Sequence, residues 1–120
     1  MAKVVEAEPE VYNHNLETVP RLYPDVRPEA DYARSLSILK WVADTAPSIK
    51  TKSGIMVGMG EEKDEVKGLM EDLVKAGCRI LTIGQYLAPS RKHWPVARYY
   101  EPEEYKGLEE MGKEMGFEAV

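Results

Sequence analysis

Apolar residues recur three or four positions apart in three segments of the chain. Leu36 and Leu39 belong to the first segment, Val66 and Leu73 to the second, and Leu108 to the third. This spacing places apolar side chains on one face of a helix. We therefore predict helices over about residues 29–44 and 61–75, and a third from about 102 that Gly116 closes.

Short apolar runs lie between these helices. Residues 54–58 and 79–84 read as strands bounded by glycine, residues 9–12 lead into a weaker strand, and residues 117–120 begin a further one. Strands that alternate with helices predict βαβ units and a parallel sheet. The expected fold class is therefore α/β, with parallel strands and two bare sheet edges.

Composition removes several functional classes. The 120 residues have a formal net charge of −5 and a pI of about 5.1, which argues against binding a nucleic-acid backbone. No apolar run approaches the roughly 18 residues of a membrane span, and the charged N-terminal segment is unlike a secretory signal. We therefore expect a cytoplasmic protein that binds neither nucleic acid nor membrane.

The cysteine count limits disulfide and metal chemistry. Cys78 is the one cysteine, so an intrachain disulfide is excluded. With His14 and His93 as the two histidines, the chain cannot supply a closed metal site. Cys78 precedes an apolar strand, and we expect it to behave as a small buried hydrophobe.

A glycine-rich stretch, Gly54-x-Met56-x-Gly58-x-x-Glu61, follows the first clear strand. Glycine lacks Cβ, so a flat ligand can lie against its backbone, and the helix N-terminus that follows attracts negative charge. The alternative is an ordinary tight turn between strand and helix. The spacing is not that of a dinucleotide fingerprint.

Polar residues follow the other two strands. Residues 13–18 (NHNLET) offer groups that bind sugar hydroxyls or an ammonium group, although they also suit local turns. Residues 85–91 (QYLAPSR) either flank a bound base or form a plain surface loop. Lys52 and Arg98 either meet an anion or are solvated, and His14 is either a general base or structural.

Four stretches together resemble signatures of lipoyl synthase, a family of radical S-adenosylmethionine enzymes. They are residues 12–23 (YNHNLETVPRLY), 30–36 (ADYARSL), 51–61 (TKSGIMVGMGE) and 81–91 (LTIGQYLAPSR). They occur in one order over nearly the whole chain, so they favour the ligand-binding interpretation of the three strand-end stretches over plain turns.

The resemblance implies a partial TIM-like radical-SAM barrel, with residues 1–120 supplying about its strands 4 to 6 and their helices. In that family such strand ends hold S-adenosylmethionine. The implied cofactor-binding residues are Asn13, Asn15 and Glu17 after the fourth strand, Lys52 for the cofactor carboxylate, Gly54, Met56, Gly58 and Glu61 in the adenine motif of the fifth, and Gln85, Tyr86 and Leu87 after the sixth.

Lipoyl synthases are transferases of lipoate biosynthesis that insert two sulfur atoms into an octanoyl group on a carrier protein. They use two 4Fe–4S clusters, and S-adenosylmethionine supplies the radical. The family's C-x-x-x-C-x-x-C triad and its second cysteine set would lie before Met1, and its R-S-S-Y-H segment beyond Val120. We therefore expect no catalytic residue and no cluster ligand in this chain, and no activity of the chain alone.

Two other interpretations remain at this point. One is a non-catalytic half-barrel subunit that assembles with a separate, cluster-bearing chain, since the sheet edges are bare. The other is a different α/β barrel enzyme. The implied partner is an octanoylated lipoyl carrier domain, and the basic segment 91–98 is either its docking surface or solvated charge.

Overall fold

Strands and helices alternate along the chain, as the apolar pattern predicts. The computed structural model describes residues 11–23, 31–88 and 95–120. The elements are β1 (Val11–Asn13), the 3-10 helix η1 (Pro20–Leu22), α3 (Tyr32–Thr45), β2 (Lys50–Val57), α4 (Lys63–Lys75), β3 (Ile80–Gln85) and α5 (Pro102–Met115). Predictions for residues 1–10, 24–30 and 89–94, including much of the basic segment, lie outside the described residues.

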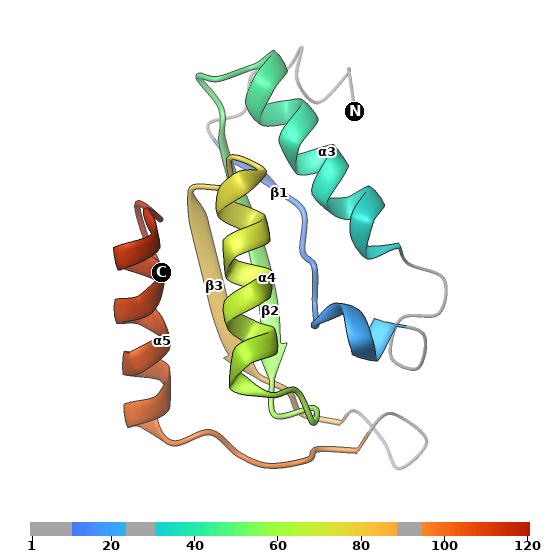
Figure 1. The fold of residues 1–120 in the computed structure, drawn as a ribbon, viewed down its shortest axis with the longest axis vertical. Coiled ribbons are helices and arrows are strands. Elements are labelled where there is room, and N and C mark those ends of the chain that lie inside the picture. The colour runs from blue at the N-terminus through green and yellow to red at the C-terminus, as the bar shows by residue number, and fades with distance from the viewer. Residues whose placement is uncertain (1–10, 24–30, 89–94) are drawn as a thin grey trace.

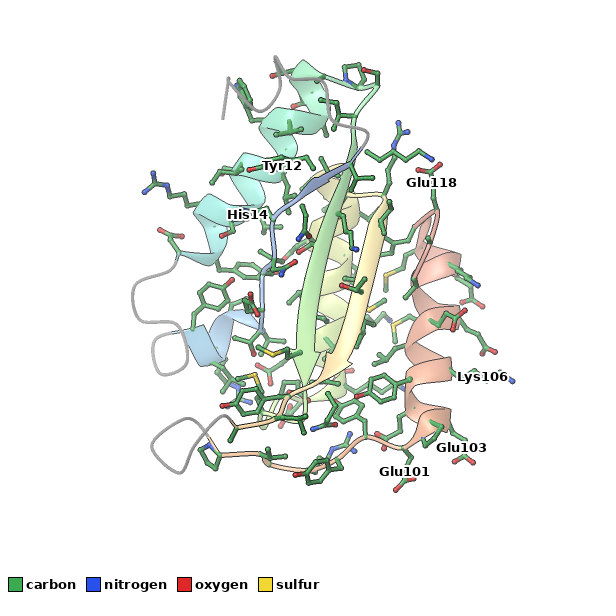
Figure 2. The ribbon with its side chains drawn as sticks, turned by 180° about the vertical axis from the view of Figure 1, so that it is seen from behind. Tyr12, His14, Glu101, Glu103, Lys106 and Glu118 are labelled. Carbon is green, nitrogen blue, oxygen red and sulfur yellow. The ribbon has the colours of Figure 1, made fainter. Side chains whose placement is uncertain are left out.

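The strands form one open parallel sheet in the order β1-β2-β3. The predicted α/β class is confirmed, and the open sheet is consistent with part of a TIM-like barrel. All three α-helices cover the same face (Figure 1), and the view from behind shows the strands in front of α4 (Figure 2). The opposite face of the sheet, called here the open face, carries no helix within the described residues.

The pleat of β2 sorts its side chains between the two faces. Thr51, Ser53, Ile55 and Val57 are buried, and Ile55 and Val57 join the core cluster under the helices. Lys52 and Met56 alternate with them and are only partly buried. The open face of β2 therefore presents Lys52, Gly54 and Met56.

The apolar faces of the helices are mostly as predicted. Val66, Leu69, Met70 and Leu73 of α4 are all buried. In α5 the buried positions are Leu108 and Gly112, and in α3 they are Leu39 and Val42, while Trp41 is 42% exposed. Helix α4 is therefore the centre of the core, with α3 and α5 on either side of it (Figure 1).

Several predicted boundaries need correction. β2 begins at Lys50, four residues before the predicted strand 54–58, because residues 50–53 pair with the neighbouring strands. Helix α4 begins two residues late because Glu62 is its N-cap and forms a capping box with Glu65. The strand predicted over 117–120 amounts to one parallel bridge, between Ile80 and Ala119.

The predicted end of the third helix is confirmed, since Gly116 follows α5 with a φ of 117°. Gly77 follows α4 in the same conformation, with a φ of 83°. Cys78 is 4% exposed, and burial raises the pKa of its thiol to about 11.

Among the described helices, none has the length and apolar character needed to cross a membrane.

Candidate functional site

Polar groups converge on the open face around Gly54. A Cβ on Gly54 would lie 2.8 Å from Oγ1 of Thr82 and 2.9 Å from Oδ1 of Asn15. Thr82 is the register partner of Gly54 on β3, and Asn13 is that of Lys52 on β1. Three neighbouring strands therefore bring two amides, a hydroxyl and an ammonium group to one side of the sheet.

The chain beyond β1 follows β2 with an irregular backbone. Glu17 donates its N–H to the Gly54 carbonyl at 3.0 Å and accepts the Met56 N–H at 2.8 Å. Its φ of 74° makes it the one non-glycine residue with positive φ in the described part of the chain. This conformation costs roughly 1–3 kcal/mol, and it keeps Glu17 beside β2 at the edge of the open face.

His14 is held by a neighbouring helix. Its Nε2 lies 3.1 Å from Oγ of Ser35 on α3, and Figure 2 shows it beside that helix. Its backbone N–H donates to the Lys52 carbonyl at 2.9 Å. This geometry favours the structural interpretation of His14 over a general base.

The Glu61 side chain points toward the protein and is hydrogen-bonded there, not toward solvent. Its carboxylate accepts the Gly58 N–H at 3.1 Å and the Met59 N–H at 2.9 Å, and the Tyr100 hydroxyl donates to it at 2.6 Å. The residue is 8% exposed. Glu61 therefore closes the turn after β2, and it lies outside the helix in which it was predicted.

The space beside Gly58 is filled by the protein itself. Gly58 has a φ of 94°, and a Cβ there would lie 2.3 Å from Nε2 of Gln85 and 2.4 Å from the Arg98 carbonyl oxygen. The two glycines of the motif thus differ. The bare backbone of Gly54 meets the ends of polar side chains, whereas that of Gly58 meets another stretch of backbone in addition to the Gln85 side chain.

The predicted residues at the end of β3 and just after it separate in space, with Gln85 as the last residue of the strand. Gln85 donates from Nε2 to the Tyr86 and Arg98 carbonyls, each at 3.0 Å, and its Oε1 accepts the Tyr100 N–H at 2.9 Å. Tyr86 is 7% exposed and belongs to the core, while Leu87 is 65% exposed. The structure therefore groups Asn13, Asn15, Lys52, Gly54 and Met56 on the open face, and Gly58, Glu61 and Gln85 in the turn beside it.

Sequence reasoning missed three residues that hold this region together. Thr82 completes the open-face group, and Tyr100 bonds Glu61. Arg21 bonds both carboxylate oxygens of Glu65 and the Gly60 carbonyl. These pairings join residues far apart in the sequence, so no local spacing signals them.

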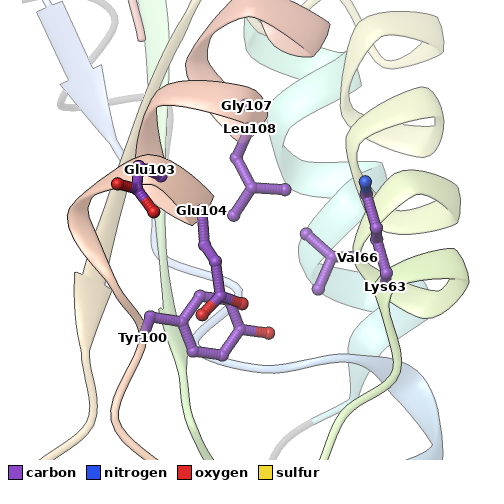
Figure 3. Close-up of a pocket in the computed structure, with 7 residues that line it drawn as sticks. All are labelled: Lys63, Val66, Tyr100, Glu103, Glu104, Gly107 and Leu108. Atoms are coloured by element: carbon purple, nitrogen blue, oxygen red, sulfur yellow. The ribbon is translucent and has the colours of Figure 1, made fainter.

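Three hollows lie among the described helices and their connections. The one between α4 and α5 has a volume of about 290 Å³ (Figure 3) and is lined by Lys63, Val66, Tyr100, Glu103, Glu104, Gly107 and Leu108. Two others lie against α4, one beside α3 and one beside η1. None of these three is lined by a predicted cofactor-binding residue. Within the described ranges, no group of three or more His, Cys, Asp and Glu side chains can hold a metal ion.

The ion pair of Glu104 should make the stability of the fold depend on pH. Arg98 donates to both its carboxylate oxygens, at 3.0 and 2.7 Å, and this pair, with the Glu101 backbone N–H, lowers the pKa of Glu104 to about 2. A lowered folded-state pKa stabilises the fold above the usual carboxyl value, and that stabilisation is lost as the pH falls through the folded value. We expect Glu104→Gln to be less stable than the wild type at pH 6.

The difference in free energy of unfolding between the wild type and Glu104→Gln should decrease as the pH is lowered from about 4.5 towards 2. Urea unfolding at a series of pH values measures it, and Glu110→Gln on the same helix is the control for losing one negative charge. A gap that stays constant down to the lowest pH at which both proteins fold would contradict the assignment.

The sequence of this chain was compared with family models and with curated proteins. No family model matches the chain. A curated lipoyl synthase of Acidithiobacillus ferrooxidans is 57% identical over 120 residues, which are all of this chain and 38% of that protein. Those of Caldanaerobacter subterraneus and Aquifex aeolicus are 58% and 54% identical over 117 residues, 98% of this chain and 41% and 42% of theirs. The chain spans about two fifths of the length of these relatives, and with this identity along its whole length it belongs to the lipoyl synthase family.

Proposed function

We propose that this chain is part of a radical S-adenosylmethionine lipoyl synthase, which inserts two sulfur atoms into a protein-bound octanoyl group. The observation that carries the proposal is the convergence of Asn15 and Thr82 over the bare backbone of Gly54, in a chain that is 57% identical to a lipoyl synthase. The proposed setting is the cytoplasm, and the proposed partner is an octanoylated lipoyl carrier.

The open face has the chemistry to hold S-adenosylmethionine. Amide oxygens of Asn13 and Asn15 accept hydrogen bonds from ribose hydroxyls or the amino group, and the Lys52 ammonium pairs with the carboxylate. Gly54 leaves room between the strands where any side chain would meet Asn15 and Thr82. Met56 adds an apolar surface for the adenine. When bound, the cofactor supplies the radical that removes hydrogen from the octanoyl chain.

The remaining predicted residues have different roles in this proposal. Gly58, Glu61 and Gln85 are already bonded or packed within the protein, so they shape the end of β2 instead of meeting the cofactor directly. Glu17 lies beside β2 through its backbone hydrogen bonds, Tyr86 belongs to the core, and Leu87 is exposed, so no direct contact with the cofactor is proposed for these three.

The iron–sulfur clusters of the family do not fit the residues of this chain. A cluster needs several thiolates, whereas Cys78 is the single cysteine and its buried thiol has a pKa of about 11. We therefore assign no step to a cluster held here. We expect the 120-residue chain by itself to assemble no cluster, and anaerobic reconstitution followed by iron and sulfide analysis measures this.

A chimera tests the proposed function. This chain replaces the matching segment of the Aquifex aeolicus lipoyl synthase, and lipoyl formation on an octanoylated carrier is measured after cluster reconstitution. We expect activity within about threefold of the parent. Asn15→Leu should lower kcat/KM for S-adenosylmethionine by about 10- to 100-fold, because a hydrogen bond to a charged group is worth about 1.5–3 kcal/mol.

The matched control is Ser37→Ala, which removes a hydroxyl that bonds the Ala33 carbonyl on the exposed side of α3. It should leave the activity unchanged. A folded, iron-loaded chimera that makes no lipoyl group would contradict the proposal, and so would an Asn15→Leu variant with unaltered kinetics.

A further inference from the structure

A short segment ahead of α5, residues 97–100, crosses the carboxyl ends of β2 and β3 (Figure 1). We call it the strap. The Ala97 N–H donates to the Gly58 carbonyl at 2.7 Å, and the Tyr100 N–H donates to Oε1 of Gln85 at 2.9 Å. The strap is thus bonded both to the turn after β2 and to the last residue of β3.

The strap delivers one side chain to the turn. The Tyr100 hydroxyl donates to Oε2 of Glu61 at 2.6 Å, and the same oxygen accepts the Gly58 N–H. Burial, followed by the hydrogen bond to Glu61 and its negative charge, raises the pKa of Tyr100, so the phenol keeps the proton that it donates. A buried carboxylate is stable only when its oxygens are bonded, and within the described part of the chain Tyr100 supplies the partner from outside the turn.

The Tyr100 ring is fixed from its other side. The Arg98 guanidinium lies 3.9 Å from the ring centre and is itself bonded by both oxygens of Glu104 on α5. Figure 3 shows Tyr100 and Glu104 together on the wall of the hollow between α4 and α5. The contacts therefore run from α5 through Arg98 and Tyr100 to the Gly58–Glu61 turn.

We propose that Tyr100 is a positioning residue for S-adenosylmethionine binding. Its hydroxyl holds the Glu61 carboxylate against the Gly58 and Met59 N–H groups, and this fixes the backbone that continues directly from Met56 and Val57. That backbone ends the strand whose open face carries Gly54 and Met56. The inference rests on the proposed function, because the ligand it serves is the cofactor assigned to that face.

Two measurements test it. In the 120-residue chain, amide hydrogen exchange at Gly58 and Met59 is compared among wild type, Tyr100→Phe and Tyr105→Phe. In the chimera, KM for S-adenosylmethionine and KM for the octanoylated carrier are determined for the same proteins. Tyr105→Phe is the matched control, since the Tyr105 hydroxyl lies 3.4 Å from Oε1 of Gln85 and does not reach Glu61.

In Tyr100→Phe we expect exchange at Gly58 and Met59 to be at least about tenfold faster, with exchange at Val66 unchanged. KM for S-adenosylmethionine should rise about tenfold, and KM for the carrier should not change. Tyr105→Phe should match the wild type in all of these exchange rates and in both KM values. If Tyr100→Phe does not fold, Glu61→Gln is used, because its amide nitrogen cannot accept an N–H and should give the same faster exchange.

Unchanged exchange in the variant overturns the proposal, whatever the enzyme assay gives. Faster exchange with an unchanged KM for S-adenosylmethionine also overturns it, because the turn would then not serve the cofactor. A wild-type chimera that makes no lipoyl group would instead contradict the proposed function. In that case the hydrogen-exchange result still decides whether Tyr100 fixes the turn.

Discussion

Gly58→Ala is expected to destabilise the fold by about 2–4 kcal/mol, through a strained φ and an overpacked contact. Its φ of 94° lies in the region that side chains rarely adopt, and the added Cβ would lie 2.4 Å from the Arg98 carbonyl oxygen. That oxygen belongs to the strap backbone and cannot rotate away. The strap must move, and its bonds to Gly58 and Gln85 are then strained or lost.

Urea unfolding followed by far-UV circular dichroism measures this loss. Gly68→Ala is the matched control, since Gly68 lies within α4 and a Cβ there meets nothing within 4 Å. It should stabilise the protein by roughly 0.5–1 kcal/mol, the helix propensity difference between the two residues. Equal stabilities of Gly58→Ala and the wild type would show that the strap does not rest on Gly58 in solution.

The helices were predictable because their signals are local. Four apolar residues of α4 recur at helical spacing and all four are buried, and Gly116 marks the end of α5 as expected. The beginning of β2 was not predictable in the same way. Lys50, Thr51, Lys52 and Ser53 look polar in sequence, and only the pairing with β1 and β3 makes them strand.

In the candidate site, too, some features were predictable from the sequence and others depend on long-range contacts. The resemblance to lipoyl synthases selected Asn13, Asn15, Lys52 and Gly54, and these lie together on the open face. It gave no reason to separate Gly58 from Gly54. The reason is the strap, which reaches Gly58 from 40 residues further along the chain, and the Tyr100–Glu61 bond, which spans 39. Contacts between residues so far apart along the chain produce no periodic pattern in the sequence.

One motif therefore serves two physical purposes. Gly58 and Glu61 make the turn after β2 rigid through contacts inside the protein. Gly54 instead keeps a gap between polar side chains on a face without helices. Substitutions at the two glycines should separate these purposes. A Cβ on Gly58 would meet the Arg98 backbone as well as the Gln85 side chain, whereas a Cβ on Gly54 would meet the ends of the Thr82 and Asn15 side chains.

Gly54→Ala is accordingly expected to spare the fold and impair the proposed function. The new Cβ would lie 2.8 Å from Oγ1 of Thr82 and 2.9 Å from Oδ1 of Asn15. Both atoms end side chains that can rotate, so the loss of stability should stay below about 1 kcal/mol, less than overpacking a rigid core costs. The rotation moves the Asn15 amide from its place, and in the chimera KM for S-adenosylmethionine should rise at least about tenfold, equivalent to about 1.4 kcal/mol.

Gly107→Ala adds the same methyl group on α5, where a Cβ meets nothing within 4 Å, and should leave that KM unchanged. Urea unfolding of both variants separates lost binding from lost folding. If Gly54→Ala binds the cofactor as tightly as the wild type, the ligand does not lie against the centre of the open face. If it unfolds as readily as Gly58→Ala, Asn15 and Thr82 are held too firmly to move, and the two glycines share one structural role.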